Sequence, residues 1–294
     1  MIHEMNKISQ QSLETKISRL KDGFLQAAYD HVAMEEPLEI RLDFLDGSAR
    51  RQKSLSITMR TPGNDEELAS GFLFTEGILQ SPKDIIGISG CGPNSGAHHG
   101  KNIVKVRLTD QANIVWPKLE RHFYATSSCG VCGKASLEAL EVQGLKPIPR
   151  DGFRFDVKKI SELPELLRSH QTVFDQTGGL HAAALFTDAG RVLAIREDVG
   201  RHNAVDKLIG SQFLAGGTPL SNALLFLSGR ASFELVQKAL VAGIPVIAAV
   251  GAPSSLAVEL AKRFDVTLLG FVREGRFNIY HGDWRIINPL GGER

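Results

Sequence analysis

The chain has 294 residues, 43% of them hydrophobic and 23% charged, which fits a soluble globular protein large enough for two domains. A formal net charge of +1 does not favour nucleic acid as a partner, and residues 1–19 lack the apolar core of a secretory signal. The least polar window, 239–258, is interrupted by glycines and prolines, so we expect no membrane helix. Together with a count of three cysteines, these features predict a cytoplasmic protein.

The N-terminal stretch opens with a polar segment and continues with strand patterns. Residues 1–29 are polar with weak helical periodicity, which predicts a tail leading into a helix. Residues 37–45 alternate apolar and polar side chains, Asp46-Gly47 is typical of a hairpin turn, and residues 53–59 alternate again. We therefore expect a hairpin here.

A helix and a third strand are predicted next. Asn64 followed by Glu67 is the pattern of a capped helix start, and this helix is expected to bury Leu68, Phe72 and Leu73. Residues 87–100 are predicted to be a glycine-rich loop, and residues 102–108 a strand. Residues 30–125 are thus expected to form a small α+β domain.

Residues 126–294 show a different pattern, in which apolar strands alternate with amphipathic helices. Strands are predicted over 181–186, 191–195, 223–227, 246–250 and 266–269. Helices are predicted over 134–143, 161–175, 202–209, 233–241 and 256–264. Continuous apolar strands between helices indicate an α/β domain with a mostly parallel sheet covered on both faces.

The start of this second domain carries two thiols, Cys129 and Cys132, flanked by glycines and followed by Lys134. Glycines leave the backbone free to turn and the sulfurs uncovered. A helix N-terminus and a nearby ammonium both favour thiolate, the reactive form of cysteine.

Three interpretations of this thiol pair stay open on the residues alone. Cys91, His98 or His99 could complete a zinc site, although the spacing is irregular. The pair could be a dithiol redox switch, although the proline and βαβ context of thioredoxin are missing. In the third interpretation one cysteine carries a persulfide and the other traps or releases it as a disulfide.

The carboxyl ends of the predicted strands carry glycine, serine and arginine, and ligands of open α/β sheets bind at such ends. Ser228, Gly229 and Arg230 precede one helix and predict a phosphate cradle. Asp198 and Arg201 lie between a strand and a helix and offer a carboxylate and a guanidinium.

A last strand end runs through Phe271, Val272, Arg273, Glu274, Gly275 and Arg276. An aromatic ring beside arginines suits a stacked base or pterin next to phosphates. Each loop could instead be an ordinary turn, but recurring arginine favours a large anionic ligand. We expect the arginines to clamp phosphates, and Asp198 or Glu234 to accept guanine N–H groups.

The segment from Thr177 to Ala183 matches part of the zinc nucleobase deaminase motif. His181 is present, but Ala183 stands at the position of the catalytic glutamate, and no P-C-x-x-C follows. The deaminase reaction therefore lacks its acid/base. We expect His181 to be a core histidine at a strand start rather than a metal ligand.

Several motifs together resemble the formate dehydrogenase accessory sulfur carriers, the FdhD family. They are the Cys129–Gly133 segment, Thr177–Ala183, Glu197–Lys207, Ser228–Glu234 and, further out, Pro37–Arg41, Gly71–Gly77 and Asn278–Tyr280. The resemblance runs from about residue 30 to about residue 287.

The resemblance implies that the protein takes sulfane sulfur from a cysteine desulfurase and holds it as a persulfide on Cys129, with Cys132 as partner. It implies that the sulfur passes to the molybdenum (or tungsten) bis-guanine-dinucleotide cofactor of a formate dehydrogenase, bound around Phe271–Arg276. It also implies a cytoplasmic homodimer, a C-terminal domain like cytidine deaminase with three layers, and no permanent metal. The alternative is a non-enzymatic chaperone that binds the cofactor, its cysteines serving zinc, structure or redox only.

Overall fold

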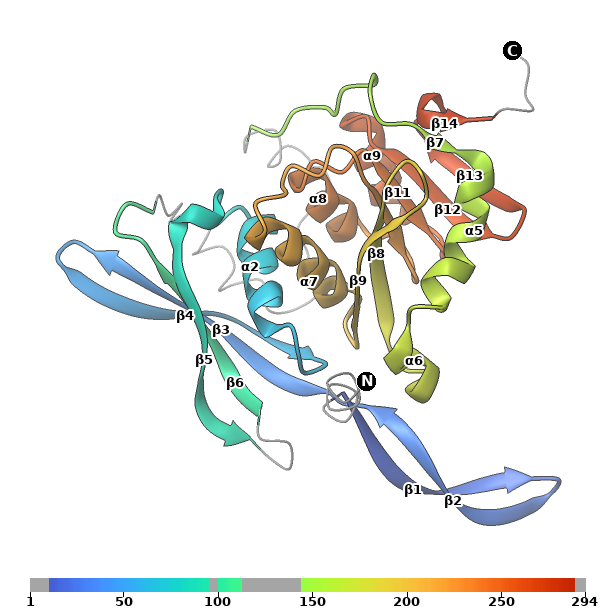
Figure 1. The fold of residues 1–294 in the computed structure, drawn as a ribbon, viewed down its shortest axis with the longest axis horizontal. Coiled ribbons are helices and arrows are strands. Elements are labelled where there is room, and N and C mark those ends of the chain that lie inside the picture. The colour runs from blue at the N-terminus through green and yellow to red at the C-terminus, as the bar shows by residue number, and fades with distance from the viewer. Residues whose placement is uncertain (1–10, 96–99, 113–143, 289–294) are drawn as a thin grey trace.

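The computed structural model describes residues 11–95, 100–112 and 144–288, and the fold below refers to these residues. Figure 1 shows a helix-covered sheet on one side, a second sheet beside it, and a long two-stranded hairpin that projects from the body. Within the described residues no helix combines the length and the apolar character that crossing a bilayer would need.

The N-terminal residues form the projecting hairpin, which we call the arm (residues 12–33), from β1 (Ser12–Lys21) and β2 (Phe24–Ala33). The prediction of a tail and helix over 1–29 is therefore wrong for residues 12–29. Asp22 and Gly23 both adopt positive φ and close a two-residue turn, a hairpin signal that outweighs the weak helical periodicity.

A four-stranded sheet follows, in the order β4-β3-β6-β5. Its strands are β3 (Glu36–Asp46), β4 (Ala49–Arg60), β5 (Ile85–Ser95) and β6 (Gly100–Leu108). The predicted hairpin and the strand at 102–108 are confirmed. The loop predicted over 87–100 is wrong for residues 87–95, which pair with β6 as a strand.

Helix α2 (Asp65–Thr75) covers this sheet and buries Leu68 and Leu73, while Phe72 is only partly buried. Asn64 precedes the helix, but its side chain makes no cap hydrogen bond. Glu67 does not reach back to it either, because its carboxylate pairs with Arg196, 2.6 Å from that guanidinium. The predicted helix is confirmed, and the predicted capping pair is wrong.

The largest sheet has six strands in the order β13-β12-β11-β10-β8-β9. They are β8 (His181–Phe186), β9 (Val192–Asp198), β10 (Leu224–Leu227), β11 (Val246–Ala249), β12 (Thr267–Arg273) and β13 (Arg276–His281). The pairs β10–β11 and β11–β12 are parallel, whereas β8–β10, β8–β9 and β12–β13 are antiparallel. The sheet is mixed, so the prediction of a mostly parallel sheet is wrong.

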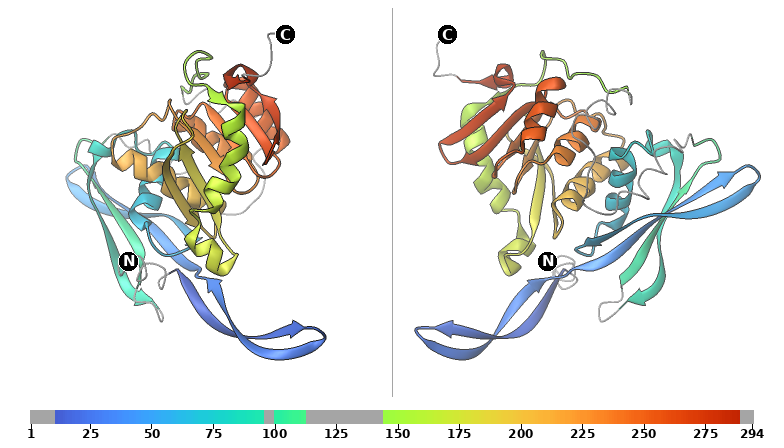
Figure 2. Two further views of the ribbon diagram at one scale, coloured as in Figure 1. Left: turned by 45° about the vertical axis from the view of Figure 1, so that its right-hand side comes forward. Right: turned by 180° about the vertical axis from the view of Figure 1, so that it is seen from behind.

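Helices cover both faces of this sheet, as the two views in Figure 2 show. One face packs on α7 (Arg201–Leu214), α8 (Phe233–Val241) and α9 (Ser255–Arg263). The other packs on α5 (Val157–Arg168), which is followed by the short α6 (Thr172–Thr177). Successive strand residues alternate between the two cores; Leu225 and Leu227 face the first, Leu224 and Phe226 the second.

The remaining elements are short and lie at the periphery. They are η1 (Pro82–Asp84), η3 (Asp283–Arg285), β7 (Phe155–Asp156) and β14 (Ile286–Ile287), the last two forming a small parallel pair. The helix predicted over 134–143 lies outside the described residues. The cytidine-deaminase likeness and the boundary between residues 125 and 126 stay predictions.

The two sheets are joined by the crossing of α2 on α7, where two glycines replace side chains. A Cβ on Gly71 would lie 1.9 Å from the carbonyl oxygen of Asp206, and one on Gly210 would lie 1.9 Å from that of Glu67. The helix backbones are therefore in direct contact, which fixes the small sheet relative to the large one.

Candidate functional site

One edge of the six-stranded sheet collects most of the residues that the sequence singled out. Strands β10, β11 and β12 end at this edge. Because β8 is antiparallel to β10, it begins here at His181, and β9 ends beside it at Asp198. The structure thus brings His181, the Asp198–Arg201 segment and the loops after β10, β11 and β12 to a common edge.

Three helices begin at the same edge. Their N-cap residues are Gly200 for α7, Ser232 for α8 and Ser254 for α9. Ser254 Oγ accepts the amide hydrogen of Ala257, while the Ser232 side chain makes no cap hydrogen bond. Helix N-termini present free N–H groups and the positive end of the helix dipole, so this edge favours an anion.

Close packing of the strand-end loops explains two of the glycines. A Cβ on Gly229 would lie 3.3 Å from His181 Nδ1, and one on Gly251 would lie 3.0 Å from three atoms of Arg230. The amide of Gly251 also donates to the Gly229 carbonyl, at 2.9 Å. Larger side chains would push the two loops apart.

Arg201 is the most informative of the four predicted arginines. Its Nε is buried without a hydrogen-bond partner in the described part of the chain. Its positive charge also contributes to the lowered pKa values of His181 and Glu234, so it lies near both side chains. Arg201 as a whole is only partly buried, and a guanidinium with an unpaired N–H is suited to an anionic ligand.

The other three arginines differ in their exposure and in the hydrogen bonds that they make within the protein. Arg230 is exposed, as expected for a residue that meets a ligand from solution. Arg273 uses Nη1 to donate to the carbonyls of Val250, at 2.7 Å, and Val272, at 2.8 Å. Arg273 therefore holds two strand ends together, while Arg276 is exposed and lines a cavity described below.

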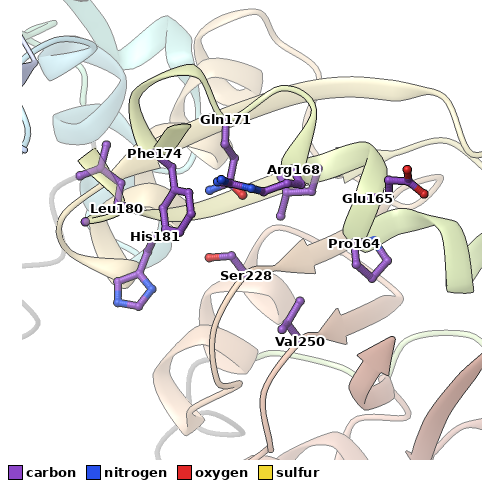
Figure 3. A pocket seen from close by; sticks show the side chains of 12 residues that line it. Pro164, Glu165, Arg168, Gln171, Phe174, Leu180, His181, Ser228 and Val250 are labelled. Atoms are coloured by element: carbon purple, nitrogen blue, oxygen red, sulfur yellow. The ribbon is translucent and has the colours of Figure 1, made fainter. Parts of the chain in front are cut away.

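A cavity of about 720 Å³ opens where the sheet edge meets α5 and α6 (Figure 3). His181 and Ser228 line it together with Phe174, Leu180 and Val250. Ser228 Oγ accepts the amide hydrogen of Ala182 at 2.8 Å, which fixes the loop after β10 against β8. The sequence did not indicate that α6 lines the cavity. Its hydrophobic pattern predicted one helix over 161–175, where the structure has the end of α5 and most of α6.

His181 is not the core histidine that the sequence favoured. It is only partly buried and lines the cavity. Burial first, and then the positive charge of Arg201, lower the pKa of His181 below its ordinary value. The imidazole is therefore mostly neutral at neutral pH and offers both a donor and an acceptor nitrogen.

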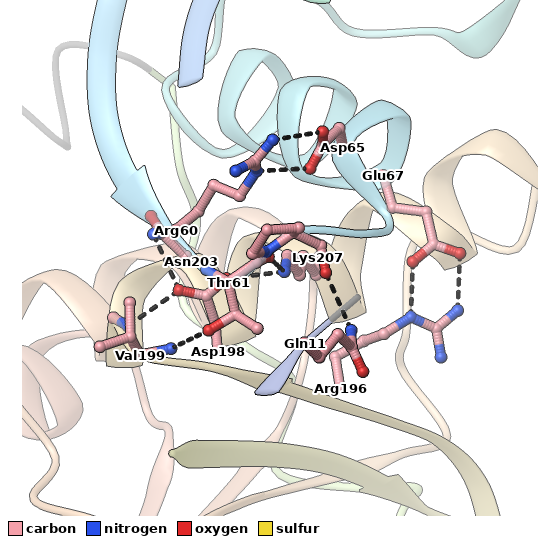
Figure 4. A network of polar contacts seen from close by, with 12 residues as sticks. Gln11, Arg60, Thr61, Asp65, Glu67, Arg196, Asp198, Val199, Asn203 and Lys207 are labelled. Carbon is pink, nitrogen blue, oxygen red and sulfur yellow. Dashed lines mark hydrogen bonds and ion pairs between the residues drawn. The ribbon is translucent and has the colours of Figure 1, made fainter. Parts of the chain in front are cut away.

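Asp198 is placed at the edge, but its carboxylate already has several protein partners (Figure 4). The side chain is 0% exposed and lies 2.6 Å from Lys207 Nζ. It also accepts hydrogens from the amides of Thr61 and Gly200 and from Asn203 Nδ2. Asp198 shapes the β9–α7 loop, and we do not retain it as a guanine acceptor.

A second cavity, of about 300 Å³, is lined by Phe271, Arg276 and Asn278. Phe271 has φ of 54° and is 44% exposed, an unusual combination for an aromatic residue. Such an outlier motivates a functional interpretation of the exposed ring. Of the predicted segment 271–276, Phe271 and Arg276 line this cavity. Val272 is fully buried in the core, and Glu274 and Gly275 are exposed in the turn after β12.

A small polar cluster beside Arg201 was only partly foreseen. Glu234 Oε2 lies 3.0 Å from His202 Nε2 and accepts from Ser232 Oγ at 3.2 Å. The hydrogen bond with His202 is the main reason why the pKa of Glu234 falls to about 2. The pairing joins the N-termini of α7 and α8, a contact that residue spacing does not reveal.

Cys129, Cys132, His98 and His99 lie outside the described residues, so the structure does not test their roles. Cys91 is a free cysteine on β5 and partly exposed. In the described ranges, no group of three or more His, Cys, Asp or Glu side chains is arranged to hold a metal ion.

Comparison with known proteins identifies the family. The model of the FdhD/NarQ family matches residues 33–287. This chain belongs to the FdhD/NarQ family. The sequence therefore pointed to the correct family on its motifs.

Curated members of this family are similar over almost the whole chain. The sulfur carrier protein FdhD of Streptomyces avermitilis is 49% identical over 92% of this chain and 94% of its own. The sulfur carrier protein FdhD of Sulfolobus acidocaldarius is 43% identical over 93% of this chain and 98% of its own. A crystal structure described as a formate dehydrogenase accessory protein, from Desulfotalea psychrophila, matches with a TM-score of 0.69 and 26% identity, over 94% of this chain and 100% of its own.

Proposed function

We propose that this protein is a sulfur carrier that activates a formate dehydrogenase by delivering sulfur to its molybdenum cofactor. The observation that carries the proposal is the similarity, over more than nine-tenths of the chain, to proteins described as sulfur carriers. The likeness to a formate dehydrogenase accessory protein supports the choice of target enzyme. A reducing cytoplasm, which keeps thiols free, is the compartment that suits this activity.

Cys129 is the residue that we propose to carry the sulfur. Its thiolate attacks the outer sulfur of a persulfide on a cysteine desulfurase. The sulfur–sulfur bond of the donor breaks, the donor cysteine leaves as a thiolate, and Cys129 holds the persulfide without net oxidation. Cys132 is positioned in sequence to trap or release that sulfur, so the protein acts as a sulfurtransferase.

The acceptor is molybdenum bis-guanine-dinucleotide, which in this proposal is cargo rather than a resident cofactor. The residues at the sheet edge fit such a ligand. The buried Nε of Arg201 has no partner in the described part of the chain, three helices point their N-termini to this edge, and Phe271 exposes a flat ring. Arg201, Arg230 and Arg276 would hold phosphates, and Phe271 would stack on a ring system.

Mass spectrometry after incubation with a desulfurase and cysteine tests the sulfur step. The proposal predicts a gain of one sulfur atom that maps to Cys129 and disappears in Cys129→Ala, with Cys91→Ala as the matched control. A protein that binds zinc stoichiometrically and gains no sulfur would instead be a cofactor chaperone with a structural or redox cysteine pair.

Binding of guanosine diphosphate, a fragment of the cargo, tests the site separately. Arg201→Gln and Arg230→Ala are each expected to weaken binding about tenfold or more, because each removes a charged donor. Arg154→Ala, which removes an exposed arginine elsewhere on the surface, is the control. Full-strength binding by both site variants would count against the proposed clamp without touching the role of Cys129.

A further inference from the structure

The small sheet carries an excess of positive charge. Its four strands hold eight lysine and arginine residues and four carboxylates, whereas the whole chain has a net charge of +1. Each carboxylate is paired with an arginine of the same sheet, at 3.3 Å or less: Glu36 with Arg60, Glu39 with Arg41, Asp43 with Arg50 and Asp46 with Arg51. The excess therefore comes mainly from β6, whose Lys101, Lys105 and Arg107 have no carboxylate partner among the described residues.

Lys105 and Arg107 point to the face of the small sheet that α2 does not cover. Val104, Val106 and Leu108 alternate with them along β6 and are buried in the core beneath α2. Among the described elements, Figures 1 and 2 show no helix over the opposite face. We call that face the basic face, and it carries Arg41, Ile57, Ile103, Lys105 and Arg107.

The neighbours of these two cations leave them uncovered and unfavourably placed. On β5, the small residues Ser89 and Gly87 lie opposite Lys105 and Arg107. On β3, Arg41 lies opposite Lys105, and like charges opposite one another on neighbouring strands are destabilising. An arrangement that costs the free protein stability is expected where a partner supplies the missing negative charge.

The carboxylate nearest in the register to Arg107 is already occupied. Asp43 lies opposite Arg107 on β3. Its carboxylate instead accepts from Arg50 Nη1 at 3.2 Å and from Gln52 Nε2 at 3.3 Å, both on the far side of β3. Arg107 therefore remains available to an anionic group from outside.

Apolar side chains beside the cations indicate a protein partner rather than a nucleic acid. Ile57 lies opposite Glu39, which lies opposite Ile103, so isoleucines flank the cations on the same face. Ile57 is 68% exposed, and Met59 of the same strand is 46% exposed. Nucleic-acid surfaces rely on many phosphate-binding cations, whereas arginine and methionine in a partly apolar patch are typical of protein interfaces. The uncompensated cations then select a partner with an acidic surface.

The basic face adjoins the start of the segment that carries the two thiols. Arg50 anchors the end of β6, because it donates to the Leu108 carbonyl at 3.2 and 3.3 Å and pairs with Asp110 at 2.6 Å. The described chain continues to Ala112, and Cys129 follows 17 residues later in the sequence. A protein bound at the basic face is therefore held close to the point from which the thiol segment departs.

The basic face lies on a different side of the molecule from the proposed ligand edge. Helices α2 and α7 pack on each other between the small sheet and the six-stranded sheet (Figure 1). A protein on the basic face would leave the strand ends at His181 and Arg201 open, and the dehydrogenase that receives the cargo has to approach that edge. This separation favours the sulfur donor as the partner at the basic face.

We propose that the basic face docks the cysteine desulfurase that supplies the sulfur. Lys105 and Arg107 meet carboxylates of that protein, and Ile57 packs beside them. The inference rests on the proposed sulfur-carrier function and adds the surface through which the donor is recognised.

Association of a purified desulfurase with the full chain, followed by surface plasmon resonance, tests the docking surface. K105E/R107E is expected to associate about tenfold more slowly than wild type at roughly 50 mM salt and to differ little at about 500 mM, because salt screens the attraction. The control K158E/K262E reverses two exposed lysines of α5 and α9 and is expected to associate like wild type. Unchanged association of K105E/R107E, or an equal loss in the control, would overturn the proposal.

The stability of K105E/R107E is the check on its fold. The Lys105→Glu change replaces a repulsive neighbour of Arg41 by an attractive one, so the variant is expected to unfold at the same temperature as wild type or higher. Slower association of such a variant then reports on the docking surface rather than on misfolding.

Sulfur loading separates this inference from the proposed function. Persulfide on Cys129 is followed by mass spectrometry with a limiting amount of desulfurase and, in parallel, with inorganic polysulfide as a small donor. K105E/R107E is expected to load about tenfold more slowly than wild type from the desulfurase, and equally fast from polysulfide, because only docking is impaired. Equal loading from the desulfurase would overturn the docking surface alone. A wild-type protein that gains sulfur from neither donor would overturn the sulfur-carrier function, and this inference with it.

Discussion

Asp198 and Lys207 form an ion pair of 2.6 Å in which neither side chain is more than 1% exposed. Lys207 Nζ also donates to the Thr61 carbonyl at 2.7 Å, and Asp198 accepts from the Thr61 amide at 3.1 Å. The pair therefore ties Thr61, the residue after β4 of the small sheet, to β9 and α7 next to the large sheet, beside His181 at the proposed ligand edge.

Lys207→Met is expected to destabilise the protein by about 3–5 kcal/mol, because it leaves the Asp198 carboxylate buried without its cation. Lys262→Met, which changes an exposed lysine on α9, is the control and should change stability by less than about 0.5 kcal/mol. Urea unfolding of both variants provides the measurement. Equal stabilities would show that the buried pair does not hold the two sheets together.

Gly210→Ala is expected to lower the free energy of unfolding by roughly 1–3 kcal/mol or more, because its methyl group would overlap the backbone of α2. Gly71→Ala should act in the same way on α7. Gly87→Ala serves as the control, since a Cβ there meets nothing within 4 Å. Thermal unfolding checks the order of stabilities, and a Gly210→Ala variant as stable as Gly87→Ala would refute the direct backbone contact.

These buried contacts also mark the limit of what the sequence can predict. The apolar runs at β10, β11 and β12 are continuous, and Gly229, Gly251 and Gly270 mark where they stop, so strand positions could be predicted closely. An apolar run predicts a buried strand but not the direction in which that strand runs relative to its neighbours. The antiparallel β8 and β9 could therefore not be distinguished from parallel strands. The Asp198–Thr61 contact spans 137 residues, and residue spacing carries no signal for it.

The candidate site, like the fold, could be predicted in part from the sequence. Glycine, serine and arginine at strand ends placed Arg201, Ser228 and Arg230 at one edge. A carboxylate next to an arginine looks like a ligand residue in sequence, whereas the fold uses Asp198 as a buried anchor. The roles of Cys129 and Cys132 stay predictions, because both residues lie outside the described ranges.

Arg201→Gln is expected to raise the pKa of His181 toward its ordinary value without fully restoring it, because burial, the larger cause, remains. In the wild type, a lowered pKa means that the folded state resists protonation. The contribution of His181 to stability is therefore present above pH 6.5 and declines as the pH falls through the pKa of the folded state. NMR titration of the imidazole checks the shift; an unchanged midpoint would place Arg201 too far away to act.

Glu234→Gln is expected to remove a pH-dependent part of the stability. The pKa of Glu234 falls from 4.5 to about 2 in the folded state, mainly through His202, so its contribution is present above pH 4.5 and is lost as the pH drops toward 2. The difference in unfolding free energy between wild type and variant should thus be larger at pH 6 than at pH 3. This difference in unfolding free energy is expected to be small, because the Glu234 side chain is 62% exposed and solvent screens its interaction with His202.

The exposed Glu259 of α9 supplies the control for that experiment. Glu259→Gln should give the same difference from wild type at both pH values. If Glu234→Gln behaves like Glu259→Gln, the hydrogen bond between Glu234 and His202 does not persist in solution.

The activity of a formate dehydrogenase co-expressed with this protein tests the central claim most directly. With the wild-type protein or Cys91→Ala, the dehydrogenase is expected to be active and its molybdenum to carry the sulfido ligand. With Cys129→Ala, we expect the dehydrogenase to contain the cofactor but to lack that ligand and at least nine-tenths of the activity. A fully active, fully sulfurated dehydrogenase matured by Cys129→Ala would contradict the account.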